Sequence, residues 1–286
     1  MKRKLLAGLG LTAALALALV VGAETVVALG NGPPVNVNPK TTVIIDYVSP
    51  EFGGPQHPGP HGNGEEDEEP TPTPEPTHDD HFTFLGGVWA DANTATPEVD
   101  PQLAFQIDLR GFPAGSDQAI LAAFASWESV TKGDLLATPS FNNVVVDFGD
   151  DINTYSMRNL GGRVLAATFI TYDDANDNDV LDAGDVFLEM DVVFNSTVKW
   201  AIDPDGEGPQ TADANGKWFD VENVAAHEDG HVFGMGHVGN GIHTLDRDKE
   251  QTMFVSAAPE ETKQRTLELD GDILGAQGSF LGYLAP

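Results

Sequence analysis

Two histidines and a glutamate stand in one short segment at a spacing that suits a metal ion. His227 and His231 are four residues apart, so on an α-helix they project from the same face, one turn above the other, and their imidazole nitrogens can reach one ion. Glu228 follows the first histidine, where its carboxylate can take a proton from a water molecule and pass it to a leaving amine. These residue types and spacings predict metal-assisted hydrolysis of a peptide bond.

Gly234 and His237 extend this pattern beyond the helix. Glycine adopts the left-handed conformation that ends a helix, so the chain can turn back after Gly234 and supply His237 as a third nitrogen ligand. Three protein ligands leave the fourth position of a tetrahedral zinc ion open, as a catalytic zinc site requires. In a chain with 31 Gly and 8 His among 286 residues, the added glycine and histidine make a chance match about three-hundred-fold rarer than HExxH alone.

The segment from His227 to His237 resembles the HExxHxxGxxH motif of the metzincin zinc peptidases, and further blocks resemble the matrixin family within that clan. Thr252-Met253-Phe254 stands where metzincins carry the Met-turn, which implies that Met253 lies beneath the zinc ion. The resemblance also implies that Glu228 is the general base and then the general acid. The other similar blocks are residues 119–127, 191–195, 219–220, 265–267 and 272–275.

Three departures from the matrixin pattern indicate a divergent member. Matrixins usually place Ser or Asp directly after the third histidine, whereas Val238 stands here. The chain has no cysteine, so the usual latency device, a propeptide cysteine on the zinc, is missing. It also has no histidine between His81 and His227, so the second, structural zinc site of many matrixins is missing too.

The resemblance implies an α+β fold of the metzincin type, in which a twisted mixed β-sheet and two long helices lie above a small irregular C-terminal subdomain that ends in a helix. Residue patterns agree with this arrangement. Apolar residues at helical spacing predict helices at 118–131, capped by Ser116 or Asp117, at 220–233 and at 267–277. Runs rich in β-branched and aromatic residues predict strands at 103–109, 143–148, 163–171 and 186–194.

One of these strands is a candidate for substrate binding. In the implied fold, the strand around residues 161–168 is the edge of the sheet above the cleft. An extended peptide can add to such an edge by main-chain hydrogen bonds. We expect Leu165, Ala166 and Ala167 to bind it.

An acidic segment at residues 174–185 has the ligand spacing of a calcium loop. Oxygen-bearing side chains stand at positions 1, 3, 5, 9 and 12, and Val180 is at position 7. Position 6 is Asp where Gly is expected, position 12 is Asp instead of Glu, and the predicted flanks are strands, so the alternative is a solvated hairpin loop. Residues 203–207 are a weaker calcium candidate. The candidate ligands of the first loop are Asp174, Asn176, Asn178, Val180, Asp182 and Asp185.

The chain divides into three predicted parts. Residues 1–23 have the basic start, apolar run and small-residue exit of a secretory signal peptide, with an uncleaved membrane anchor as the alternative. Residues 24–81 are acidic and rich in Pro and Gly, which predicts a disordered linker or a short pro-segment. The apolar patch at residues 42–45 is a short strand or part of that pro-segment. Residues 82–286 are the predicted catalytic domain.

Composition limits the partners. The 45 acidic and 14 basic residues give a formal net charge of −31, which excludes nucleic acid and anionic membrane surfaces as partners. Because there is no cysteine, an exported chain must be held by its core and by bound ions instead of disulfides. Calcium would suit that role.

The sequence therefore predicts a secreted, monomeric zinc endopeptidase that hydrolyses peptide bonds in extracellular proteins or peptides. It would be associated with the cell surface if the N-terminal segment stays uncleaved. The competing prediction is a non-catalytic, calcium-stabilised surface or adhesion module that keeps a metzincin fold. The intact Glu228 favours the enzyme, and the missing latency device favours the module.

Overall fold

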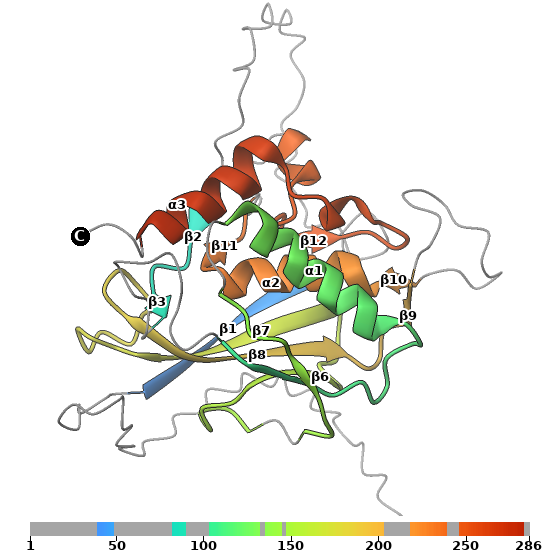
Figure 1. Cartoon of the computed structure of the whole chain (residues 1–286), viewed down its shortest axis with the longest axis horizontal. Helices are drawn as coiled ribbons and strands as arrows, with labels where there is room; N and C mark the ends of the chain where they lie inside the picture. The colour runs from blue at the N-terminus through green and yellow to red at the C-terminus, as the bar shows by residue number, and fades with distance from the viewer. Residues whose placement is uncertain are drawn as a thin grey trace, which may run out of the picture.

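The computed structural model describes residues 39–48, 82–89, 103–131, 135–144, 147–202, 218–238 and 246–282 (Figure 1). The predicted signal peptide, most of the predicted linker and the weaker calcium candidate at 203–207 lie outside these residues. Within the described ranges, no helix has the length and apolar character needed to cross a membrane.

A mixed eight-stranded β-sheet is the base of the fold. Its strand order is β12-β1-β7-β8-β6-β4-β5, and β3 also pairs with β8. The strands β4, β5, β6 and β8 run parallel to one another, whereas β7 is antiparallel to both β8 and β1. The strands are β1 (Pro39–Val48), β3 (Val88–Trp89), β4 (Phe105–Ile107), β5 (Ser140–Phe141), β6 (Asn153–Arg158), β7 (Val164–Asp173), β8 (Val186–Asn195) and β12 (Ser256–Ala257).

Two helices, α1 (Ser116–Val130) and α2 (Val221–Val232), cover one face of this sheet (Figure 1). They pack against each other, and the indole nitrogen of Trp127 on α1 donates a hydrogen bond of 2.7 Å to the carbonyl of Ala226 on α2. Trp127 and Ile120 are fully buried against the sheet core. Burial of such side chains contributes about 1.5–3 kcal/mol each, so α1 fixes α2 in place.

The C-terminal segment lies on the other side of these helices from the sheet (Figure 1). Two pairs of short strands add to the core: β9 (Trp200–Ala201) pairs with β10 (Phe219–Asp220), and β2 (Thr83–Phe84) pairs with β11 (Met235–Gly236). The remaining elements are the 3-10 helices η2 (Asp246–Glu250) and η3 (Lys263–Arg265), the π-helix η4 (Leu269–Ile273) and the helix α3 (Leu274–Gly282).

This mixed sheet with helices agrees with the predicted α+β class. The predicted helices at 118–131 and 220–233 are present, but α1 starts at Ser116, and its N-cap is Gly115 with φ 93°, not Ser116 or Asp117. The predicted third helix begins later than expected, because η4 precedes α3. The predicted strand at 143–148 is wrong in its described residues, and the strand near it is β5.

The strand β1 corrects the predicted linker at 24–81. Residues 39–48 belong to the sheet and pair with β7 from Pro39↔Asp173 to Tyr47↔Val164. The apolar patch at residues 42–45 is therefore a strand, which was one of its two predicted readings. Its Thr, Val, Ile and Tyr residues favour a strand, and its pairing with β7 satisfies backbone groups that a lone strand would leave open.

Candidate metal centre

The helix α2 is anchored at the end that precedes the histidines. Asp220 is its N-cap, and the side chain accepts a hydrogen bond of 2.7 Å from the backbone nitrogen of Asn223. Arg265 of η3 donates a further bond of 2.7 Å to the same carboxylate, and the Asn223 side-chain nitrogen donates to Gln264 at 2.6 Å. N-capping contributes about 1 kcal/mol, and these contacts also join α2 to the C-terminal segment.

The turn after α2 has the predicted conformation. Phe233 is the C-cap, and Gly234 has φ 82°, in the left-handed region. The chain then reverses through β11 and returns His237 toward the helix. This confirms the expectation that Gly234 ends the helix and allows the third histidine to reach the first two.

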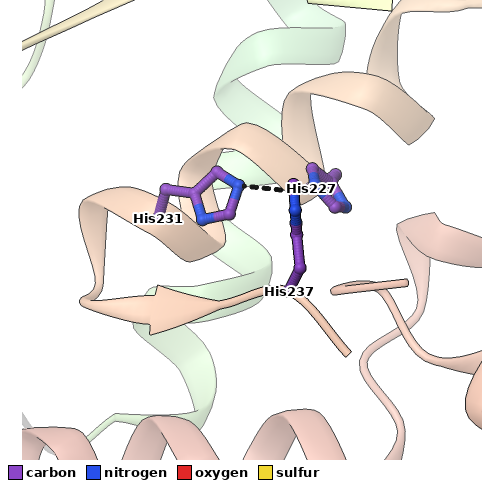
Figure 2. A group of neighbouring side chains, drawn as sticks. All are labelled: His227, His231 and His237. Carbon is purple, nitrogen blue, oxygen red and sulfur yellow. Dashed lines mark hydrogen bonds between the residues drawn. The ribbon is translucent and has the colours of Figure 1, made fainter. Parts of the chain in front are cut away.

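The three histidines converge on one point. Figure 2 shows His227 and His231 projecting from α2 and His237 reaching them from the segment after β11. The Nε2 atom of His237 lies 3.0 Å from Nε2 of His227 and 3.2 Å from Nε2 of His231. Nitrogens bound at 2.0–2.1 Å to a tetrahedral zinc ion are separated by about 3.3 Å. The spacing of the three nitrogens therefore suits one such ion.

The opposite ring nitrogens fix the chemical state of two of these histidines. The Nδ1 atoms of His227 and His231 lie 2.7 Å from the carbonyl oxygens of Thr252 and Met235. A carbonyl only accepts, so both Nδ1 atoms carry the proton and both Nε2 atoms present a lone pair. Both of these Nε2 atoms lie within 3.2 Å of Nε2 of His237, and one ligand atom from each ring lies within 4.8 Å of the others. Three neutral imidazole nitrogens at one point are a donor set that fits a metal ion.

Burial keeps these histidines neutral, as ligands must be. His227 and His231 have no exposed surface, and His237 is partly buried. Loss of solvation lowers the pKa of His227 to about 3 and that of His237 to about 4, and lowers the pKa of His231 well below its usual value. All three rings are therefore uncharged at neutral pH, with nitrogen lone pairs ready for a cation.

Glu228 is held beside this cluster by a neighbour that the sequence did not single out. Thr168 on β7 donates a hydrogen bond of 2.5 Å to its Oε2 atom. The other oxygen, Oε1, is buried and accepts no hydrogen bond from the part of the chain that the structure describes. Burial raises the pKa of Glu228 to about 8. One oxygen is thus positioned by Thr168, and the other is left for a different partner.

Met253 lies against α2 at the level of the histidines. It has no exposed surface, and a Cβ atom added to Gly230 would come within 2.0 Å of its sulfur and 2.8 Å of the Trp127 ring. Only glycine fits between His227 and His231 at this point of the helix. Gly230 was missed in the sequence, although a glycine inside a helical pattern is a signal of close packing.

Asp272 holds the turn that carries Met253. Its buried carboxylate accepts hydrogen bonds from the backbone nitrogens of Thr252 at 2.7 Å, Met253 at 3.2 Å and Glu268 at 3.0 Å. The Thr252 carbonyl thereby stays in place for His227. Asp272 belongs to a block that resembles matrixins, but its role was not predictable from that block.

Val238, the residue after the third histidine, is part of the core. Its side chain is buried, its backbone nitrogen donates to the Met253 carbonyl at 2.9 Å, and its carbonyl accepts from Val255 at 3.3 Å. The residue after the third histidine is therefore part of the core and joins the histidine segment to the methionine turn.

The predicted substrate edge is wrong in this structure. Leu165, Ala166 and Ala167 lie on β7, which is paired on one side with β8 and on the other side with β1. In the pairing with β1, Ala167 stands opposite Ile45 and Val164 stands opposite Tyr47, and the register shifts between these two pairs. Neither edge of β7 is open along these residues, because β1 and β8 pair with it. The addition of residues 39–48 to the sheet was not predicted.

In the predicted calcium loop, the candidate side chains hydrogen-bond to one another and to backbone nitrogens of the same loop. Asp174 accepts hydrogen bonds from the backbone nitrogens of Asn178 and Asp179, and Asp185 accepts from those of Ala175 and Asp182. The side-chain nitrogens of Asn176 and Asn178 donate to Asp182, and Val180 is exposed. Among the described residues, the group of acids and histidines close enough to share an ion is the three histidines. Calcium at residues 174–185 stays a prediction.

Comparison with models of known protein families gives no match for this chain. A search among curated proteins finds none with significant sequence similarity. The site is therefore interpreted from its geometry and from the residues of the motif.

Proposed function

We propose that the chain is a zinc-dependent endopeptidase that hydrolyses extended peptides, with a matrixin-like arrangement of its site. The observation that carries this proposal is the convergence of three histidine Nε2 atoms next to a buried glutamate of α2. Three nitrogen ligands hold an ion and leave a coordination position for chemistry, whereas a closed structural site uses four.

The ion would be held by His227, His231 and His237. When bound, zinc supplies Lewis-acid polarisation of the scissile carbonyl and makes water a stronger nucleophile. Glu228 accepts the proton of the attacking water at Oε1 and delivers it to the nitrogen of the leaving amine. Thr168 keeps the carboxylate oriented for both transfers through its bond to Oε2.

The rival function is a non-catalytic surface module stabilised by calcium. The acids of the 174–185 loop give it no support, because among the described residues the group of acids and histidines close enough to share an ion is the three histidines. The buried Glu228 without a partner for Oε1 is also costly in a protein that does not use it, because an unsatisfied buried oxygen costs about 1–3 kcal/mol.

Cleavage of casein by the zinc-loaded protein tests this proposal. The substitution Glu228→Gln keeps the shape of the side chain and removes its basicity, so we expect the rate to fall at least a hundredfold while one zinc per chain is retained. Glu222→Gln, on the first turn of the same helix, is the matched control and should cleave like the parent. Because β1 covers β7, the assay is run on the intact chain and on a chain cut within residues 49–81 and freed of its N-terminal piece. Equal rates for Glu228→Gln and the parent in both forms would contradict the proposal.

A further inference from the structure

The strand β1 lies where two elements of the candidate site meet. In the sheet it stands between β7 and β12, antiparallel to the first and parallel to the second, with Tyr47↔Ser256 and Val48↔Ala257 in register. β7 carries Thr168, the partner of Glu228, and β12 follows the methionine turn. β1 is therefore inserted between the element that positions the glutamate and the element that follows Met253 (Figure 1).

The register brings β1 close to the catalytic glutamate. Ile44 is the cross-strand partner of Thr168, and directly opposed residues of paired strands have their side chains on the same face. Ile44 accordingly packs against the core, whereas its neighbour Val43 is 42% exposed on the other face. Asp46, two residues beyond Ile44, is buried.

The reacting groups are closed to solvent in this arrangement. Glu228, His227 and His231 have no exposed surface. A peptide bond must reach these groups to be cleaved, and an extended peptide needs a free strand edge to bind by main-chain hydrogen bonds. Both edges of β7 are taken, one by β8 and one by β1.

We propose that residues 39–48 are an intramolecular pseudosubstrate, which fills the peptide-binding slot between β7 and β12 and must leave it before a substrate can bind. This inference rests on the proposed endopeptidase function and adds its regulation. The occupant is an extended segment of the same chain, so the slot accepts an extended peptide antiparallel to β7. It would replace the latency device that the chain cannot build without cysteine.

Occupation of the slot by the chain itself has a kinetic signature. A strand tethered to the same chain competes with substrate as an intramolecular ligand. The apparent affinity for substrate falls by the fraction of chains whose slot is open. The intact chain should therefore show a higher KM than a chain freed of β1, at a similar kcat.

Two adjacent substitutions test this in the intact, zinc-loaded chain. Ile44→Asp places a charge on the buried face of β1 and weakens its seat, so kcat/KM for an internally quenched peptide should rise about tenfold or more, through KM. Val43→Asp places the same charge on the exposed face and should stay within about twofold of the parent. An Ile44→Asp chain that loses its zinc, or that cleaves no faster than Val43→Asp, would overturn the inference by making β1 a structural strand.

Hydrogen exchange gives a readout that needs no activity. In the Glu228→Gln chain cut within residues 49–81, removal of the N-terminal piece should speed exchange of the β7 amides that pair with β1, and a synthetic peptide of residues 39–48 should restore their protection. Unchanged exchange on removal, or global unfolding with loss of zinc, would contradict a removable pseudosubstrate.

The two proposals fail differently. If the cut chain binds zinc and the 39–48 peptide but shows no cleavage that depends on Glu228, the endopeptidase function fails, and the slot and its occupant stand. If intact and cut chains cleave with equal kcat/KM and Glu228→Gln is inactive in both, the function stands and the pseudosubstrate fails.

Discussion

The histidine cluster and the acidic loop at residues 174–185 both have the ligand spacing of a metal site, yet among the described residues only the histidines form a group of acids or histidines close enough to share an ion. Two ligands of the cluster stand on a capped helix, where a spacing of four residues fixes their separation. The candidate ligands of the loop stand on irregular backbone. There the loop folds so that its carboxylates accept hydrogen bonds from backbone nitrogens of the same loop. Ligand spacing thus predicts geometry where the backbone is regular.

The largest effect should come from removing one nitrogen of the cluster. His231→Ala leaves two ligands, so we expect zinc affinity to fall at least a hundredfold and the thermal stabilisation by zinc to disappear. Asp182→Asn, in the acidic loop, should leave zinc affinity unchanged. Competition with a chromophoric chelator measures both. Equal losses in the two variants would show that the cluster is not the zinc site.

Glycine substitutions compare the packing of the two regions. Gly230→Ala forces a methyl group into the Met253 sulfur, and overpacking of this kind costs about 3 kcal/mol, more than the helix gains from alanine. Gly184 has open space around it but φ 109°, so Gly184→Ala should cost only about 1 kcal/mol. Urea unfolding of the metal-free chains gives both values. The reverse order would refute the close packing beneath the histidines.

The pH dependence of the metal-free protein should reflect the buried histidines. Their folded pKa values, about 3 for His227 and about 4 for His237, lie below the value of about 6.5 in an unfolded chain. Burial of the neutral rings therefore contributes stability that is complete above pH about 6.5 and is lost as the pH falls toward the pKa values of the folded state.

The pH dependence of stability is measured in chains that carry Glu228→Gln, because the raised pKa of Glu228 changes stability with pH in the opposite direction. Stability from that carboxyl is present below its unfolded pKa and lost as the pH rises toward about 8. We expect the melting temperature of Glu228→Gln to fall more steeply between pH 7 and pH 5 than that of the double variant that carries both Glu228→Gln and His227→Ala. Parallel curves would mean that the histidine is not buried as a neutral ring.

The smallest effect should follow calcium addition. An ion at residues 174–185 would have to replace the hydrogen bonds that Asp174 and Asp185 already accept. We expect the melting temperature to change little at micromolar calcium and to rise slightly at about millimolar concentrations, typical of weak sites. A large shift at micromolar calcium that Asp185→Asn abolishes would show that the loop rearranges into a real site.

The sequence predicts the residues of the histidine cluster but not the contacts that surround them. The helix of His227, its end at Gly234 and the buried position of Met253 were predictable, because each depends on local backbone rules or a motif. Thr168 and Asp272 were not, because their roles arise from contacts across the fold. The strand β6 was not predicted, because its polar residues Asn153 and Thr154 are buried through hydrogen bonds to β8. A pattern of apolar residues does not reveal such a strand.

The place of β1 depended most on tertiary structure. Its own residues suggested only a short strand or pro-segment within a linker, and its pairing with β7 could not be read from either strand. That pairing turned a predicted substrate edge into a covered one. It is also the basis for proposing residues 39–48, in place of a propeptide cysteine, as the element that keeps the site latent.

Native mass spectrometry of the intact chain, loaded with zinc and calcium and then freed of excess metal, counts the ions that the chain holds. We expect one zinc per chain in the parent and in Glu228→Gln, and none in a chain with His227, His231 and His237 replaced by alanine. Absence of zinc from the parent, or a retained zinc in the triple variant, would contradict a zinc centre built from these three histidines.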